Sequence, residues 1–413
     1  MPITNIPGVY YDEDVTYELT GEGSKIPVII GATGNTAIAE VKDENNNITT
    51  KAYKVDGSEI RKFYGWDEVN TPCNAENPGI CPKTDAQHPD TSYTDETIKT
   101  TNNQLAKFLY EFFEEARLQY NDDIGVPYIY VIDVGDGTSK DAWIKALETA
   151  KVKRDAIIEA YVGIDNITNY SVKSFLEGAH ASIMEETHDL DLKNGFTTFG
   201  YNNPDNVTDA DLIALTAENT GVQLSRIGII EPVVPGKQFA RICVTPANTE
   251  PGYEEFRTVE PGTFKDRTKA QMLALQNAGI IFGRDEHIND EVYPKINLCV
   301  ATSFRKTARP ADSLFHARFN ADDLLREVFS ACYKQIKANE SVTNIAYLQT
   351  RVNKLVNDRV IAEEMIKWDE KTGQGTKLNV AQSEDDAYNM IVSGQMQPQK
   401  CTIAINVKAT LKI

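Results

Sequence analysis

The chain has 413 residues, 41% of them hydrophobic, which is enough to form the cores of two or three domains. Asp and Glu outnumber Lys and Arg by 61 to 42, and the formal charge of −19 disfavours direct binding to nucleic acid or to anionic membranes. No stretch approaches the ~20 apolar residues of a membrane helix, and residues 1–11 lack the pattern of a signal peptide. We therefore expect a protein that is made in the cytoplasm and stays there until another process releases it.

The first 24 residues contain no helix pattern, and from Val9 to Leu19 the apolar residues fall on odd positions, interrupted by Glu13. This period of two is typical of an extended segment with one apolar face. The sequence Gly-Glu-Gly-Ser at 21–24 then separates this segment from the next apolar run, as a flexible joint would. We expect an extended N-terminal arm over residues 1–24 that can reach a neighbouring molecule. Its candidate contact residues are Pro7, Gly8, Val9, Tyr11, Val15, Tyr17 and Leu19.

Strand-like and helix-like segments alternate through residues 25–260. Buried strands are predicted by the apolar runs at 26–31, 128–134, 157–164 and 226–234, with a weaker strand signal at 49–55. Helices are expected at 102–120, 141–150, 171–188 and 209–219, and a long surface loop at 67–96. The first of these helices carries an apolar stripe of Leu105, Phe108, Leu109, Phe112 and Ala116. This alternation predicts a mixed α/β body with a largely parallel sheet.

Helices and strands also follow one another in residues 261–400. A helix at 266–277 is expected to end at Gly279, because glycine favours the left-handed cap, and to lead directly into a strand at 280–283. Two more helices are predicted at 322–337, with Asn320 as the N-cap, and at 344–367. We expect an α+β domain that contains a pair of helices.

Apolar and polar side chains alternate strictly over residues 401–413, where the chain ends. This period predicts a terminal strand with one apolar face. Its candidate contact residues are Ile403, Ile405, Val407, Leu411 and Ile413.

Both extremities are therefore amphipathic and strand-forming, and each needs a sheet to pair with. A terminal strand can close the sheet of its own domain, or it can add to the sheet edge of a neighbour. In the second case, two such ends link subunits head to tail, and contacts of this kind generate rings or helical filaments. The pattern alone leaves both arrangements open.

The strongest enzyme-like feature is GATGN at 31–35, which follows an apolar strand as a dinucleotide-binding turn would. The turn lacks the third glycine at the proper distance, and the sequence contains no Gly-Lys-Ser or Gly-Lys-Thr phosphate loop. An isolated pair of glycines commonly just turns the chain. A nucleotide-dependent α/β enzyme is the alternative hypothesis, and we assign no catalytic residue and no cofactor.

Histidines and cysteines give no clear metal site. His180 and His188 flank two glutamates, but a spacing of eight residues does not place two imidazoles on one helix face. The six cysteines are scattered, and most have the character of small buried hydrophobes. Cys73 and Cys81 share a loop rich in Pro and Gly, where they form a free thiol pair or, as the alternative, a disulfide or metal site.

Several segments resemble contractile-tail sheath proteins of phages and phage-like injection systems, in the same order along the chain. The resemblance is carried by IPGVYYDED at 6–14, PVIIGATGN at 27–35, KFYGW at 62–66, TKAQMLALQNAGIIFGRDE at 268–286 and GQMQPQKCTIAINVKATLKI at 394–413. It covers both ends and is thin between about 66 and 260. The segment ATSFRKT at 301–307 differs from the Gly-x-Arg-Thr segment that is usual in this family.

The resemblance implies a structural subunit, not an enzyme, that forms hexameric rings stacked into a helical sheath around a tail tube. Its expected partners are further copies of itself, the tail tube protein, and baseplate and tail terminator proteins. Its expected location is a virion tail or phage-like particle assembled in the host cytoplasm; another tail component, such as a tube or baseplate protein, is the second alternative. The implied division is an arm (1–24), an α/β body that is partly outward-facing and variable (25–260), an inner α+β domain (261–400) and a strand arm (401–413).

Overall fold

The computed structural model describes a body and a C-terminal lobe. The described residues are 25–34, 37, 41–46, 48–50, 54–70, 92–117, 126–151, 153, 156, 158–164, 197–200, 207–216, 227–246, 249–302, 304, 314–337, 345–382 and 390–399. The predicted arms, 1–24 and 401–413, and the predicted helix at 171–188 lie outside them.

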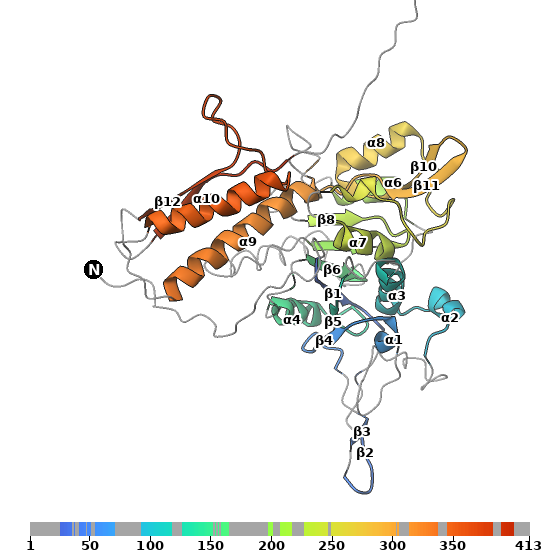
Figure 1. The fold of residues 1–413 in the computed structure, drawn as a ribbon. Coiled ribbons are helices and arrows are strands. Elements are labelled where there is room, and N and C mark those ends of the chain that lie inside the picture. The colour runs from blue at the N-terminus through green and yellow to red at the C-terminus, as the bar shows by residue number, and fades with distance from the viewer. Residues whose placement is uncertain are drawn as a thin grey trace, which may run out of the picture.

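A seven-stranded sheet forms the centre of the body (Figure 1). Its order is β4 (Ile60–Phe63), β5 (Ile129–Asp133), β1 (Pro27–Gly31), β6 (Ile158–Val162), β7 (Thr197–Gly200), β8 (Ile227–Ile230) and β9 (Ile280–Ile281). All neighbours are parallel except β4, which is antiparallel to β5 at one edge. Strands β1, β5, β6 and β8 are buried at every position, because parallel sheets are covered on both faces, and this explains their continuous apolar sequences.

Helices cover both faces of this sheet. Helices α3 (Gln104–Arg117) and α7 (Pro235–Val244) contribute to the core on one face. Helices α4 (Lys140–Lys151), α6 (Asp209–Leu215) and α8 (Lys269–Ala278) contribute to the core on the other. All five residues of the predicted α3 stripe are buried, which confirms that interpretation. The body is therefore a three-layer α/β arrangement, as the alternating sequence pattern predicted.

Short elements decorate the body. Helices α1 (Trp66–Val69) and α2 (Asp95–Thr100) lie near α3, and a 3₁₀ turn covers Pro251–Tyr253. Two hairpins are present, β2 (Val41–Lys42) with β3 (Ile48–Thr50) and β10 (Gly283–Ile288) with β11 (Glu291–Ile296). The first of them projects away from the sheet (Figure 1).

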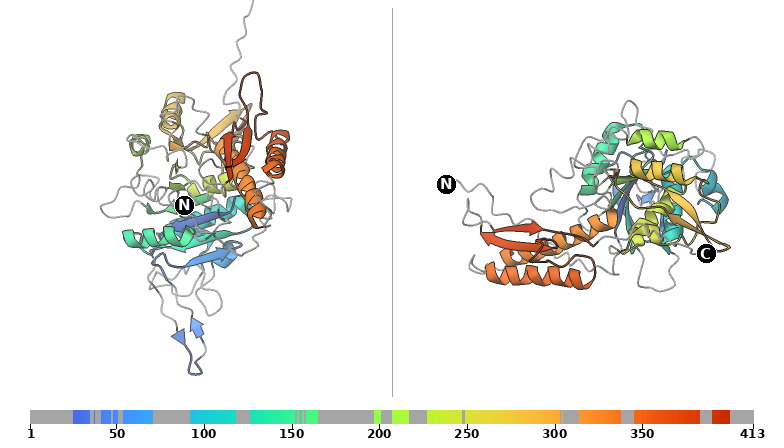
Figure 2. Two further views of the ribbon diagram at one scale, coloured as in Figure 1. Left: turned by 90° about the vertical axis from the view of Figure 1, so that its left-hand side faces the viewer. Right: turned by 90° about the horizontal axis from the view of Figure 1, so that it is seen from above.

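The C-terminal lobe lies to one side of the body (Figure 2). It consists of α9 (Phe315–Lys337), α10 (Ile345–Ile361) and the hairpin of β12 (Lys377–Gln382) and β13 (Met390–Gln395), and it has its own apolar core. Helix α9 belongs to both parts, because Phe315 and Phe319 lie in the body core and Leu324 and Val328 in the lobe core. The helix pair predicted from the sequence is therefore present.

Several predicted boundaries are wrong. The expected strand at 226–234 ends at Ile230, and Val233 and Val234 lead into α7, which begins with Pro235 at its first position. Helix α9 begins at Phe315, so Asn320 is a helix residue and not an N-cap. Helix α10 ends at Ile361 rather than 367, and α1 occupies the start of the predicted loop. Strand β7 was not anticipated.

The junction of α8 and β9 was predicted correctly. Gly279 is left-handed at φ 79° and caps α8, and β9 follows at once. Because β9 joins the large sheet, the sheet extends past residue 260 and the body core reaches Phe319.

The close approach of α3 and α7 depends on Gly236. A Cβ atom at this position would lie 2.2 Å from the carbonyl oxygen of Phe108 and 2.7 Å from Cβ of Glu111.

We expect Gly236→Ala to lower the free energy of unfolding by about 2 kcal/mol, because two helices must separate to admit the methyl group. Chemical denaturation measures this, with the exposed Lys269→Ala on α8 as the control; equal stability of both variants would contradict the close packing.

Candidate functional site

Both predicted groups of contact residues, Pro7 to Leu19 and Ile403 to Ile413, lie outside the described residues, so their roles stay predictions. The described structure instead presents the surface that such strands would need. It is the hairpin of β12 and β13, which ends at Gln395 and is followed by described residues to Gln399.

The hairpin rests on the helix pair by one face. Leu378 and Val380 of β12 are buried against α9 and α10, and Val392 of β13 is packed beside them. Asn379 and Ser393, which are paired across the hairpin, are exposed on the other face. A two-stranded sheet is marginal in isolation, so this packing is what stabilises it.

The outer edge of β12 is covered by its own subunit. The side-chain amide of Gln349 on α10 donates from Nε2 to the carbonyl oxygen of Leu378 at 2.9 Å. Its Oε1 accepts from the backbone N–H of Val380 at 2.7 Å. Two residues before Leu378, the N–H of Thr376 donates to the carbonyl oxygen of Ile366 at 2.9 Å.

The outer edge of β13 differs. In an antiparallel pair, the residues that face the partner strand alternate with residues whose backbone groups point outward. Since Leu378 and Val380 point outward on β12, their partners Gly394 and Val392 point outward on β13. Within the described part of the chain, no hydrogen bond reaches the outward backbone groups of Val392 or Gly394.

The GATGN turn has a different role from the one that a dinucleotide site requires. The hydroxyl of Thr33 donates to the buried carboxylate of Asp133 at 2.7 Å, and the N–H of Gly34 donates to the carbonyl oxygen of Gly135 at 2.8 Å. A nucleotide phosphate would meet this carboxylate, and the next described element is strand β2 rather than a helix N-terminus. The turn links β1 to β5, and its geometry argues against the nucleotide hypothesis.

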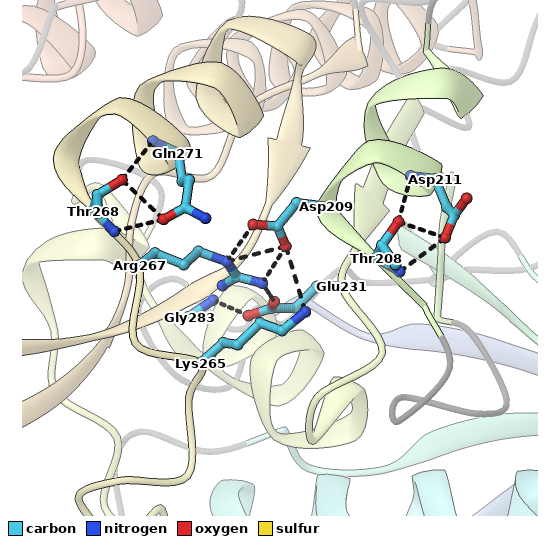
Figure 3. Close-up of polar contacts among 9 residues, drawn as sticks. All are labelled: Thr208, Asp209, Asp211, Glu231, Lys265, Arg267, Thr268, Gln271 and Gly283. Carbon is cyan, nitrogen blue, oxygen red and sulfur yellow. Dashed lines mark hydrogen bonds and ion pairs between the residues drawn. The ribbon is translucent and has the colours of Figure 1, made fainter.

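A buried ionic network joins the ends of several elements at the carboxyl edge of the sheet (Figure 3). Arg267 Nη2 donates to Glu231 Oε2 at 2.7 Å and to Asp209 Oδ1 at 3.0 Å. Glu231 Oε1 also accepts from the N–H of Gly283 at 2.6 Å. The network thus connects β8, α6, the segment before α8 and β10, and its charges are paired as buried charges must be.

Two capping boxes fix the helices beside this network (Figure 3). Thr208 with Asp211 begins α6, and Thr268 with Gln271 begins α8, each through reciprocal bonds between side chain and backbone. These pairs have the Thr-x-x-Asp and Thr-x-x-Gln spacing that could have located both helix starts from the sequence. The network itself carries no comparable local signal.

A cavity of about 690 Å³ lies next to the network, between α3, α7 and the segment before α8. Glu111 of α3 lines it and accepts a hydrogen bond from the N–H of Gly236 at 3.0 Å. Burial raises the pKa of Glu111 to about 7. Because this carboxyl is tied to the start of α7, we interpret it as a packing element that carries a proton at low pH.

Glu111 should make stability depend on pH. Its pKa in the folded state exceeds the ordinary value of 4.5, so the folded protein holds a proton that the unfolded chain releases between about pH 4.5 and 7. Its contribution therefore weakens as the pH rises through that window. We expect Glu111→Gln to raise the melting temperature at pH 8 and to change it little at pH 5. Calorimetric scans at both values test this, and an equal shift at the two would contradict it.

The buried residues His316, Cys243 and Cys299 have structural surroundings. His316 Nδ1 lies 2.9 Å from Glu250 Oε2, and Glu250 also accepts from the N–H of Cys299. Cys243, Cys299 and Cys332 are free thiols. No group of three metal-ligating side chains occurs among the residues that the structure describes. His180, His188, Cys73 and Cys81 lie outside the described residues.

None of the described helices has the length and hydropathy that a membrane span requires.

We compared the sequence and the fold of this chain with those of known proteins. No protein family and no curated protein matches the chain by sequence. Solved structures do match. The contracted sheath complex of the extracellular contractile injection system PVC is 12% identical with a TM-score of 0.59, covering 100% of this chain and 99% of that one. The anti-feeding prophage baseplate, 6-fold symmetrised, contains a chain 12% identical with a TM-score of 0.57, covering 100% of each. The sheath tail protein from Listeria innocua is 7% identical with a TM-score of 0.52, covering 92% of this chain and 94% of that one.

This chain has the fold of contractile sheath proteins. The match extends over the whole length, including the middle region where the sequence resemblance was thin. The expected resemblance is therefore confirmed at the level of the fold. At such identities the positions of contact residues do not transfer, so they have to be argued from this chain itself.

Proposed function

We propose that this chain is the repeating subunit of a contractile sheath. Copies polymerise as stacked rings around a tail tube, and the sheath shortens to drive that tube through a target envelope. The observation that carries the proposal is the fold match, over 92% to 100% of this chain, to the sheath complex of an injection system and to the sheath tail protein from Listeria innocua. The protein acts through its contacts with other molecules and catalyses no reaction.

The same likeness supports six-fold rings, because one matching chain belongs to a baseplate described as 6-fold symmetrised. Heterologous contacts between identical subunits close into rings or continue as helices, and a stacked sheath uses both. The tube, a baseplate and a tail terminator are the expected partners at the inner surface and the two ends. The particle is a virion tail or a phage-like tail, assembled in the host cytoplasm.

Strand exchange links the subunits in this proposal. The terminal segment 401–413 and the arm 1–24 have the alternation of strands with one apolar face. The hairpin of β12 and β13 provides a sheet with an apolar face already packed on α9 and α10. Main-chain pairing binds the donor strand and not the body that carries it, so the lattice can stay connected while rigid bodies move.

Removing residues 402–413 should abolish polymerisation and leave a folded, dispersed protein. The reason is that the deletion takes away the donor strand but none of the described cores. Negative-stain microscopy of the full-length and shortened proteins measures the outcome, with circular dichroism as the test of folding. We expect hollow striated cylinders only from the full-length protein.

A matched pair of single substitutions separates strand pairing from a general effect of the terminus. Val407→Ser alters the predicted apolar face, and Asn406→Ser alters the polar face next to it. The first should reduce polymer yield and the second should not, because only the apolar face gains from burial. Normal cylinders from the shortened chain would overturn the strand exchange, and the absence of cylinders from the full-length chain would count against the sheath function.

A further inference from the structure

We propose that Gln349 closes one edge of the C-terminal hairpin, so that a strand from a second copy of this chain adds to β13 and not to β12. This inference rests on the proposed function, because it specifies where the donor strand of a polymerising subunit binds. It makes Gln349 a residue that determines the specificity of the interface.

The side chain of Gln349 takes the place of a strand residue. Its primary amide offers one donor and one acceptor, as a peptide group does, and engages the carbonyl oxygen of Leu378 and the N–H of Val380 together. These groups are two residues apart on the same edge, which is the spacing that a neighbouring strand would use. An incoming strand at β12 would therefore have to displace a pair of hydrogen bonds that already exists.

The orientation of Gln349 is fixed by its helix. Leu348 and Val352 of α10 are buried in the lobe core, which holds this turn of the helix against the hairpin. Nε2 of Gln349 also donates to Oδ1 of Asn353 at 2.8 Å, one helical turn later. The amide is thus held in place before any partner arrives.

Backbone contacts cover the beginning of the same edge. The N–H of Thr376 is bonded to the carbonyl oxygen of Ile366, and Thr376 forms a parallel bridge with Lys367. On the outer edge of β12, the N–H of Thr376, the carbonyl oxygen of Leu378 and the N–H of Val380 are therefore bonded within their own subunit. Covering an edge in this way is a known means of preventing unwanted strand addition.

The β13 edge has the properties of an acceptor. The outward groups of Val392 and Gly394 have no hydrogen bond within the described residues, and Val392 adds to the apolar face on the helix pair. A strand placed there would continue this apolar face by every second side chain. Segment 402–413 of a second copy fits, because its residues alternate without interruption and it begins shortly after Gln399, where the described chain ends.

Gly394 is part of this edge. Its φ of 156° is a conformation that residues with a side chain rarely adopt, and a Cβ atom here would lie 2.1 Å from the carbonyl oxygen of Lys377. The glycine lets β13 lie close to β12 where the new strand would pair.

Residue-resolved amide hydrogen exchange on the full-length protein, dispersed and polymerised, tests the inference. In the dispersed wild type, the N–H of Val380 should exchange slowly, and those of Val392 and Gly394 rapidly. Polymerisation should slow Val392 and Gly394 and leave Val380 unchanged. Gln349→Met should accelerate exchange at Val380 about tenfold, as expected for the loss of one hydrogen bond.

Gln349→Glu is the conservative variant, because it keeps the oxygen that accepts from Val380 and loses the donor to Leu378. Slow exchange at Val380 should return in this variant, and Tyr347→Phe, at an exposed position of the same helix, should behave as wild type. Unchanged exchange at Val380 in Gln349→Met would overturn the inference, as would polymers in which Val392 and Gly394 stay rapid. If the wild type forms no polymer, the proposed function fails, and the dispersed variants still decide whether Gln349 closes the edge.

Discussion

Backbone groups at the edge of a strand need hydrogen-bond partners, and this requirement shapes the C-terminal lobe. The hairpin of β12 and β13 has only two strands, so half of its ladder positions face outward. On β12, the N–H of Thr376 is bonded to Ile366, and the carbonyl oxygen of Leu378 and the N–H of Val380 are bonded to Gln349. On β13 they are available within the described residues. The two edges therefore differ in how many outward backbone groups are already bonded. Strand addition at β13 alone would give every subunit of a polymer the same orientation.

In the body, unlike the C-terminal hairpin, helices cover the strands of the sheet on both faces, and the buried charges are paired. Arg241 of α7 is bonded to Glu115 of α3 on one face of the sheet, and Arg267 is bonded to Glu231 and Asp209 at the sheet edge, so both ionic contacts hold together segments that are distant in sequence. Helix α9 then extends from the body core into the lobe core without interruption. The body core and the lobe core are therefore connected by one continuous helix.

Local patterns in the sequence predicted much of the body. The buried run at β1, the stripe on α3 and the cap at Gly279 are each decided by residues close together in the chain. Helix α7 was missed because Val233 and Val234 extend the apolar run of β8, although Pro235 marks the helix start. The predicted cap at Asn320 is wrong because the apolar stripe used to locate the helix began at Leu324, whereas α9 begins at Phe315. The contacts of Gln349 and Arg267 join residues about 30 to 60 positions apart, so no local pattern reports them.

The central claim is that the predicted terminal strand of one copy completes the sheet of another at β13. A cryo-electron microscopy reconstruction of the polymer, at a resolution that traces the main chain, tests it most directly. The account predicts a strand from residues 401–413 of a neighbouring subunit beside β13, with Gln349 still bonded to β12. A terminal segment folded back onto its own subunit, with no sheet shared between copies, would contradict it.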